Sequence, residues 1–161
     1  MTAVVPSPAT PSHPAAIHDD LENFTPYLMN RIMARYNRGV ESALKEVGVS
    51  VAQMRALAVL AESGPRTVNE LSVLTVIKQS TLSRTLDTME AAGLIRREAQ
   101  NGDSRYRRIV MTDAGKATYR SAWPAMLGMR DTMLSALSSE EKATFNELLL
   151  RIFYDIRHHE Y

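Results

Sequence analysis

Apolar side chains recur at helical spacing through most of the chain, and the first such run is the row Leu28, Ile32, Tyr36, Val40 and Leu44. Side chains four residues apart share one face of a helix, so the row predicts an amphipathic helix of about 20 residues. Thr25-Pro26 is typical of a helix start, because proline fits the first helical position. Gly48 is typical of a helix end.

Three capping-box sequences predict the starts of further helices, at Ser50–Gln53, Thr67–Glu70 and Ser138–Glu141. In this motif a Ser or Thr side chain and a Glu or Gln side chain three residues later each accept a hydrogen bond from the other residue's backbone N–H. The first two boxes predict helices that end near Gly64 and at Leu74. The third opens a last helix with the apolar stripe Phe145, Leu148, Leu149, Ile152 and Ile156.

A tight turn, Thr75 to Lys78, leads to a further helix, after which the pattern changes to that of strands. The segments Leu94–Glu98 and Tyr106–Met111 flank Asn101–Ser104, a turn-forming cluster that predicts a β-hairpin. Thr112 caps the helix that follows. The predicted order is α-α-α-α-ββ-α-α, a mainly α fold in which a small β-hairpin forms the wing of a winged helix-turn-helix.

The helix after the tight turn has the side chains expected of a recognition helix. Such a helix fits the major groove of B-DNA, which is about 12 Å wide, and its N-terminal residues meet the base edges. Here those residues supply an amide, two hydroxyls and a guanidinium, from Gln79, Ser80, Thr81 and Arg84. Arginine suits guanine, glutamine suits adenine and a hydroxyl suits either. The residues at the complementary spacing are predicted to face the core: Leu82, Leu86 and Met89.

The distribution of charge favours the same segment. The 161 residues include 19 Lys and Arg against 18 Asp and Glu, a net charge of +1. From Val76 to Arg108, however, seven basic residues stand against four acidic ones. The basic residues of the hairpin are all arginines, whose planar fork suits phosphates and narrow minor grooves. Beside a helix-turn-helix, this basic run favours DNA binding over the alternative of a solvated hairpin face.

The run from Ser50 to Gly115 resembles the multiple-antibiotic-resistance regulator (MarR) family of dimeric winged-helix transcription factors. The matching residues are Thr67…Glu70-Leu71, Ser80-Thr81-Leu82-Ser83-Arg84, Gly93-Leu94-Ile95…Arg97, Asp103…Arg105 and Met111-Thr112…Gly115. The resemblance implies a helical dimerisation module from residues 21–48 and 113–158, and a winged helix-turn-helix DNA-binding domain from residues 50–112. Residues 1–20 contain four of the seven prolines and are predicted to be a flexible N-terminal arm.

The resemblance also implies roles for wing residues. By this likeness Arg105 enters the minor groove at the wing tip, Asp103 orients the wing arginines, and Arg107 joins the DNA-binding set. Arg97 is expected to pair with Asp103 across the hairpin rather than to contact DNA. One departure from the family is Lys78, which stands where a capping residue usually precedes the recognition helix. Lysine cannot accept backbone N–H bonds, and we expect Lys78 to contact a DNA phosphate instead.

Proteins of this family commonly respond to small aromatic acids, drugs or acyl-thioesters in a crevice between the dimerisation and DNA-binding regions. The resemblance therefore implies a small aromatic acid or acyl-thioester effector. Tyr27, Arg31 and Arg35 form a helical stripe that could hold a carboxylate, and the alternative is the solvated face of an amphipathic helix. Trp123 could line the crevice, and the alternative is a place in the core.

Other functions lack their signatures. The chain has no cysteine, which excludes thiol catalysis, disulfides and thiolate metal sites. It has no nucleophile elbow, phosphate-binding glycine loop or metalloprotease helix, so we predict no enzyme, no catalytic residue and no cofactor. We predict no metal site at His158-His159, because adjacent side chains point about 100° apart on a helix. No apolar run reaches the roughly 18 residues of a membrane span, and no secretory signal is visible, so we predict a cytoplasmic location without membrane contact.

The sequence thus predicts a homodimeric, sequence-specific DNA-binding transcriptional regulator. We expect a ligand-responsive repressor that binds a pseudo-palindromic double-stranded DNA operator, with two recognition helices about 34–36 Å apart in successive major grooves. The alternative is a winged-helix protein-interaction module that does not read DNA. The operator sequence, the regulated genes and the effector stay open.

Overall fold

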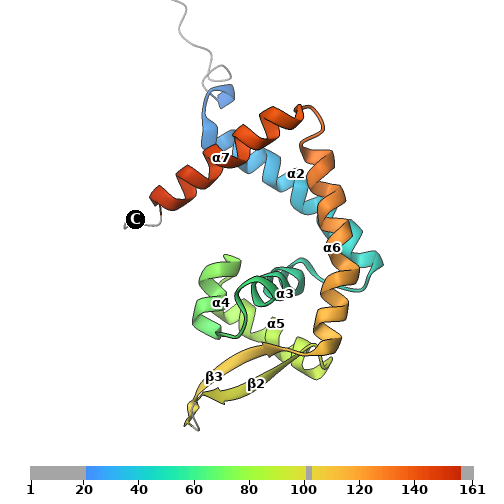
Figure 1. Cartoon of the computed structure of the whole chain (residues 1–161), viewed down its shortest axis with the longest axis vertical. Coiled ribbons are helices and arrows are strands. Elements are labelled where there is room, and N and C mark those ends of the chain that lie inside the picture. Colours follow the sequence, from blue (N-terminus) through green and yellow to red (C-terminus); the bar gives the residue numbers. More distant parts are fainter. Residues whose placement is uncertain (1–20, 101–102, 157–161) are drawn as a thin grey trace, which may run out of the picture. The chain divides into compact units, whose positions relative to one another are not determined.

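The computed structural model describes residues 21–100 and 103–156, and of residues 100 and 103–106 it describes the backbone alone. The helices, shown in Figure 1, are α2 (Thr25–Glu46), α3 (Val51–Ser63), α4 (Val68–Thr75), α5 (Gln79–Ala91), α6 (Asp113–Met133) and α7 (Ser139–Ile156). The strands are β1 (Arg66–Thr67), β2 (Ile95–Gln100) and β3 (Asp103–Met111). This is the predicted order and fold class, with β1 as an addition. The predicted arm at 1–20 lies outside the described residues.

Contacts divide the chain into two units, residues 1–35 and 36–161, so that the boundary falls within α2. The described part of the first unit is residues 21–35, which include the beginning of α2. The second unit contains the end of α2 and all the other elements. None of the described helices has both the length and the hydropathy that crossing a membrane requires.

The predicted capping boxes are confirmed at all three helix starts. The Ser50 hydroxyl accepts from the backbone N–H of Gln53 at 3.1 Å, and the Gln53 side chain accepts from the Ser50 N–H at 2.9 Å. The same reciprocal pair joins Thr67 to Glu70 before α4, and Ser138 to Glu141 before α7. Each box satisfies backbone donors that a helix start otherwise leaves without an intrahelical partner.

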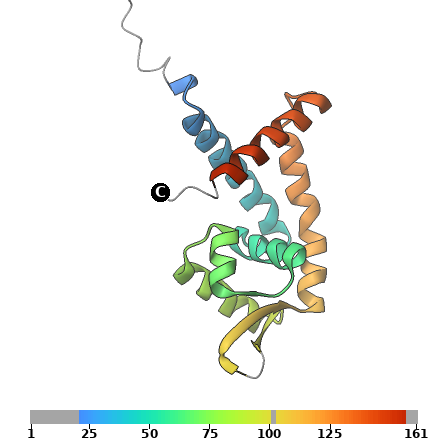
Figure 2. The same ribbon diagram turned by 60° about the vertical axis from the view of Figure 1, so that its left-hand side comes forward.

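The three strands form an antiparallel sheet in the order β1-β3-β2. The two longer strands make the hairpin, in register from Ile95↔Met111 to Ala99↔Arg107, with an irregularity between Ala99 and Gln100. Figure 2 shows the hairpin extending away from the helices that precede it. β1 pairs Arg66 with Ile109 and thereby ties the start of α4 to the wing.

The core of the winged helix-turn-helix is made by α3, α4, α5 and the sheet. The predicted inner face of α5 is confirmed, because Leu82, Leu86 and Met89 are fully buried. They belong to one apolar cluster with Leu57 of α3 and Ile109 of β3. A second cluster joins the end of α2 to α3 and α6, through Val40, Leu44, Val49, Met54 and Ala122.

The start of α6 is packed tightly against the base of the hairpin. Thr112 caps the helix as predicted, accepting from the Gly115 N–H at 3.1 Å, and its hydroxyl also donates to the Gly93 carbonyl at 2.6 Å. A β-carbon on Gly115 would lie 2.1 Å from the carbonyl oxygen of Leu94. Only a residue without a side chain fits at this contact, which fixes α6 on the wing.

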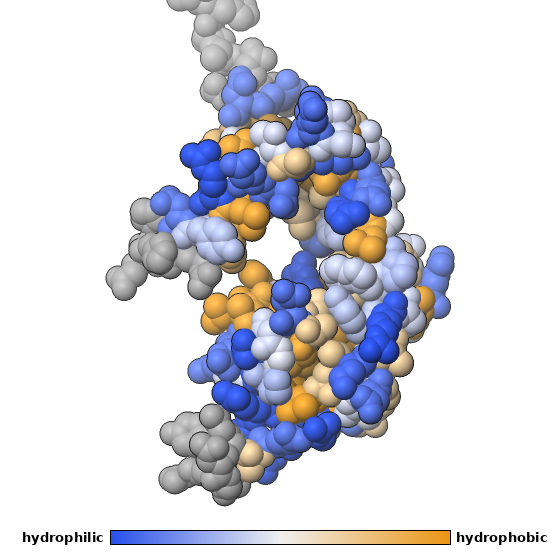
Figure 3. Space-filling model, in the orientation of Figure 1, coloured by the Kyte–Doolittle hydropathy of each residue, from blue (hydrophilic) through white to orange (hydrophobic). Residues whose placement is uncertain are grey.

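The last helix, α7, has no buried residue. Apart from Leu149, which is half-buried, its large apolar side chains are between 38% and 56% exposed, and Figure 3 shows apolar atoms at the surface of this helix. The exposed residues are Phe145, Leu148, Leu150, Ile152, Phe153, Tyr154 and Ile156. The helix and its apolar stripe agree with the sequence prediction, but a single chain leaves the stripe largely in solvent.

Candidate nucleic-acid interface

The turn between α4 and α5 directs the candidate recognition helix. α4 ends at Val76, whose backbone is left-handed with φ 55° and ψ 42°, and its N–H bonds back to the carbonyls of Ser72 and Val73. A β-branched residue is rarely found in this conformation. Lys78 then precedes α5 without a side-chain cap, as the sequence predicts. The first turn of α5 therefore keeps backbone donors available to a ligand.

Five predicted DNA-binding residues gather at the start of α5 and are all exposed: Lys78, Gln79, Ser80, Thr81 and Arg84. We call these five the recognition row. Among the described residues, none forms a hydrogen bond with the side chains of Gln79, Ser80 or Arg84. Their amide, hydroxyl and guanidinium groups are therefore available to base edges or phosphates.

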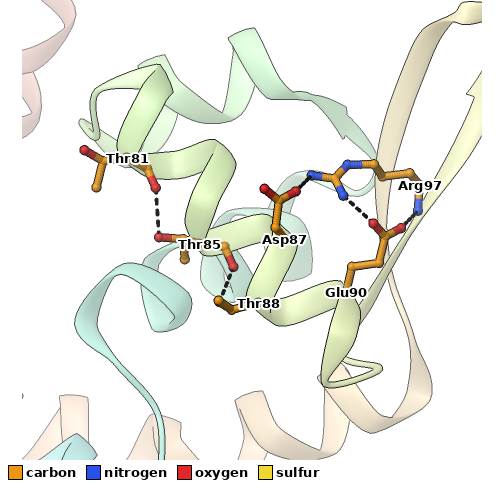
Figure 4. Close-up of polar contacts among 6 residues, drawn as sticks. All are labelled: Thr81, Thr85, Asp87, Thr88, Glu90 and Arg97. Carbon is orange, nitrogen blue, oxygen red and sulfur yellow. Dashed lines mark hydrogen bonds and ion pairs between the residues drawn. The ribbon is translucent and has the colours of Figure 1, made fainter.

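Two other hydroxyls of α5 are already used within the helix (Figure 4). Thr85 donates to the carbonyl of Thr81 at 3.1 Å, and Thr88 donates to the carbonyl of Thr85 at 2.7 Å. Such bonds to the preceding turn satisfy the hydroxyl locally. The later part of α5 therefore has its threonine hydroxyls bonded within the helix, and in this it differs from the recognition row.

A single arginine of the wing connects β2 to α5, as Figure 4 shows. Arg97 Nη2 lies 2.6 Å from Asp87 Oδ1, Nη1 bonds to Glu90 Oε2, and the Arg97 backbone N–H donates to Glu90 Oε1 at 3.0 Å. The Arg97 side chain is only 19% exposed. Burial opposes its charge, but the bonds to both carboxylates outweigh burial and raise the pKa of Arg97.

Arg97 has the structural role that the sequence predicts, and its described partners, Asp87 and Glu90, lie on α5. The side chain of Asp103 lies outside the described residues, so the pairing across the hairpin stays a prediction. The acidic residues Asp87 and Glu90 recur three apart on one helix face, which was a signal in the sequence. Their partner could not be found from sequence spacing, because it depends on where β2 crosses α5.

The remaining wing residues are described in part. Arg107 is exposed on β3. For Asp103 and Arg105 the backbone lies in β3, and both side chains lie outside the described residues, so their roles stay predictions. Arg96 is paired with Glu98 at 2.6 Å.

The residues predicted to bind a ligand fall in different units. Tyr27, Arg31 and Arg35 lie in the first unit, where the Arg31 guanidinium donates to the Tyr27 hydroxyl at 2.8 Å and lies 5.6 Å from its ring centre. Arg31 and Tyr27 therefore already bind each other. Trp123 lies in the second unit, 37% exposed, with its ring centre 5.3 Å from that of Tyr119.

The described residues contain no group of three or more histidine or acidic side chains arranged to hold a metal ion. The histidines considered in the sequence, His158 and His159, lie outside the described residues.

Comparison with known proteins identifies the fold and the family. The model of the MarR family matches residues 47–105. A crystal structure of a MarR family transcriptional regulator from Silicibacter pomeroyi is 41% identical, with a TM-score of 0.77, over 88% of this chain and 95% of that one. The HTH-type transcriptional repressor IacR of Pseudomonas putida is 24% identical over 93% of this chain and 92% of its own length.

A more distant structure has the same fold. A mutant of MarR from E. coli, solved in complex with operator DNA, is 19% identical, with a TM-score of 0.72, over 86% of this chain and 99% of that one. The helix order and the wing point to the same family as the 41% identical relative, which is matched along nearly its whole length. This chain belongs to the MarR family of transcriptional regulators.

Proposed function

We propose that this protein is a homodimeric repressor that binds a pseudo-palindromic DNA operator and releases it in response to a small organic ligand. The observation that carries DNA binding is the recognition row, whose polar side chains are exposed at the N-terminal end of α5. The Arg97 contact supports it, because the wing and the recognition helix are held together as one surface.

Sequence reading is assigned to Gln79, Ser80, Thr81 and Arg84, and phosphate binding to Lys78. The wing residues Arg105 and Arg107 add contacts to the minor groove or backbone, with Asp103 orienting them. This division follows a general rule: contacts to phosphates position a protein on DNA, and contacts to base edges specify the sequence.

The proposed dimer rests on exposed apolar surface. In α7 the exposed side chains are too many and too contiguous for an ordinary surface helix. The beginning of α2 also exposes apolar residues, among them Leu28 and Ile32. A second copy of the chain would cover these surfaces, and residues 21–48 and 113–158 would form the dimerisation module around the DNA-binding domain at 50–112.

A small aromatic acid or acyl-thioester is proposed as the effector. It would release DNA only if it binds more tightly to the arrangement of the protein that cannot bind DNA than to the arrangement that can. Such a regulator acts in the cytoplasm, without a cofactor and without catalysis.

Salt dependence of DNA binding tests the proposal. Because each neutralised phosphate releases counterions, the affinity for duplex DNA should fall steeply as salt is raised. The full chain would be titrated with its operator, selected from a random duplex pool, and with unrelated duplex at several salt concentrations. We expect a selected sequence to bind at least a thousandfold more tightly than unrelated duplex.

The alternative, a winged helix that binds a protein and does not read DNA, is favoured by one observation. Val73, Leu74 and Val76 form an exposed apolar patch at the end of α4. Failure to enrich any duplex, with no salt dependence, would favour this alternative and reject the operator-binding repressor.

A further inference from the structure

The turn between α4 and α5 contains a residue type that its backbone does not favour. Val76 has φ 55° and ψ 42°, in the left-handed region, where a β-branched side chain is rare and strained. Among the residues that the structure describes, the others with a positive φ are all glycines: Gly48, Gly64 and Gly93. The chain thus uses glycine at every other described position with such a backbone and departs from this choice only at Val76.

The turn itself does not need the valine side chain. The Val76 N–H bonds to the Val73 carbonyl at 3.2 Å, and the Ile77 N–H bonds to the Ser72 carbonyl at 3.2 Å. This pair of bonds is the Schellman motif, which usually has glycine at the position of Val76. Ile77 is half-buried against the core that contains Leu71. The backbone bonds and Ile77 therefore fix the turn.

The Val76 side chain is 85% exposed, more than any other large apolar side chain that the structure describes. Its neighbour Val73 is 75% exposed, but it lies within the regular helix α4 and carries no such strain. A strained backbone conformation that is kept without an internal contact to stabilise it indicates a function for the residue. We therefore look for the partner of the Val76 side chain outside the chain.

The surroundings of Val76 suit nucleic acid. Lys78, the first residue of the recognition row, is two residues away, and the segment 71–86 contains two basic residues and no acidic one. A DNA phosphate therefore meets no like charge along this segment. Because the turn runs directly into the start of α5, it approaches the same groove that the recognition row enters.

The major groove offers one apolar group, the C5-methyl of thymine, beside its hydrogen-bond donors and acceptors. The recognition row contains hydrogen-bonding and charged side chains and no wholly apolar one. We propose that Val76 contacts a thymine methyl in each operator half-site and so adds a thymine preference to the sequence that the recognition row reads. The inference rests on the proposed operator binding and deepens it, because it assigns a base to a residue outside the recognition helix.

Deoxyuridine tests this contact, because it pairs as thymidine does and lacks only the C5-methyl. Each thymine of the selected operator would be replaced in turn, and binding of the full-length chain measured by fluorescence anisotropy. We expect one thymine in each half-site whose replacement weakens binding by the unchanged chain about fourfold, the effect of burying one methyl group. With Val76→Ala the same replacement should have no further effect, because the methyl has already lost its partner.

Two further variants locate the contact. Val73→Ala removes the neighbouring exposed valine and should leave the effect of the thymine replacement at about fourfold. Val76→Thr keeps a methyl group at the same position and should retain part of the thymine preference. Urea unfolding of Val76→Ala shows that this variant is folded, so that a change in its binding has its cause at the interface.

The possible results separate this inference from the proposed function. If every thymine replacement costs the same in Val76→Ala as in the unchanged chain, Val76 reads no thymine and the inference is overturned. If Val76→Ala also binds the operator with full affinity, the exposed patch of Val73, Leu74 and Val76 is left for a protein partner. Failure to select any operator would instead reject the proposed function, and this inference with it.

Discussion

Arg97 holds two carboxylates of α5 with one guanidinium, and its low exposure protects these bonds from solvent. A surface ion pair contributes little to stability, whereas a partly buried arginine with two partners fixes the geometry around it. The recognition row at the other end of α5 gains from this arrangement, because the helix that presents it is anchored to the wing.

Arg84 is expected to read a base. Replacing it by alanine should cost roughly 1–3 kcal/mol of binding free energy and relax specificity at one base pair. Arg105→Ala should instead weaken all sequences alike and reduce the salt slope by about 1. Fluorescence anisotropy with single-base operator variants measures both. An equal loss on every sequence for Arg84→Ala would make it a phosphate contact, and an unchanged affinity for Arg105→Ala would remove the wing from the interface.

Val76 combines a left-handed backbone with a β-branched side chain that is 85% exposed. Asparagine tolerates this conformation, so Val76→Asn should stabilise the fold by about 1 kcal/mol through relief of strain. Val73, also exposed but within α4, is the control, and Val73→Asn should change stability little. Urea denaturation compares them. A destabilised Val76→Asn variant would show that the Val76 side chain has a stabilising contact.

At the scale of elements, the junction between α6 and the hairpin is the most constrained contact. Gly115→Ala should destabilise the protein by about 3 kcal/mol, because its β-carbon meets a backbone carbonyl that cannot rotate away. Gly128, in the same helix, has open space around it, and Gly128→Ala should stabilise by about 0.5–1 kcal/mol. Thermal or urea unfolding tests the pair, and equal effects in the two variants would contradict the packing described.

The capping boxes predict how stability responds to acid. Hydrogen bonds from Thr67 lower the pKa of Glu70, and those from Ser138 lower the pKa of Glu141, below the ordinary value of 4.5. A carboxylate with a lowered pKa in the folded state stabilises above its unfolded pKa, and this contribution is lost as the pH falls through the folded pKa.

As the pH is lowered from neutral to well below 4.5, the free energy of unfolding should therefore fall less in the double variant Glu70→Gln, Glu141→Gln than in the unchanged chain. Unfolding by urea across this range measures the difference. Glu147→Gln, on the exposed surface of α7 outside any box, is the control. The same acid response in the double variant and the unchanged chain would contradict the prediction.

Local chemistry explains which elements the sequence could predict. The caps at Ser50, Thr67 and Ser138 depend on residues three apart, and the buried face of α5 depends on a spacing of three and four. β1 was not predicted, because its two residues are too short for a pattern and exist only by pairing with β3. The partners of Arg97 likewise depend on where β2 crosses α5, which no local spacing reveals.

For the whole molecule, the exposed stripe of α7 predicts association. Ile152, about half-exposed, should lie in the dimer interface, so Ile152→Glu should produce monomers at micromolar concentration by burying a charge without a partner. Asn146→Asp, a charged change at another exposed position of α7, should leave the dimer intact. Sedimentation velocity distinguishes the two. A folded monomer of the unchanged chain at that concentration would refute the dimer.

The 21 residues of α6, with Pro124 inside them, form one helix from the hairpin base to its C-terminal end. At 1.5 Å per residue the helix is about 31 Å long, so a rotation of about 5° about its glycine-fixed start displaces the other end by about 3 Å. Contacts around Ala122 and Met129 join this helix to the end of α2. A small adjustment at the start of α6 is thus enlarged along its length, and in the proposed dimer it would change the distance between the two recognition helices.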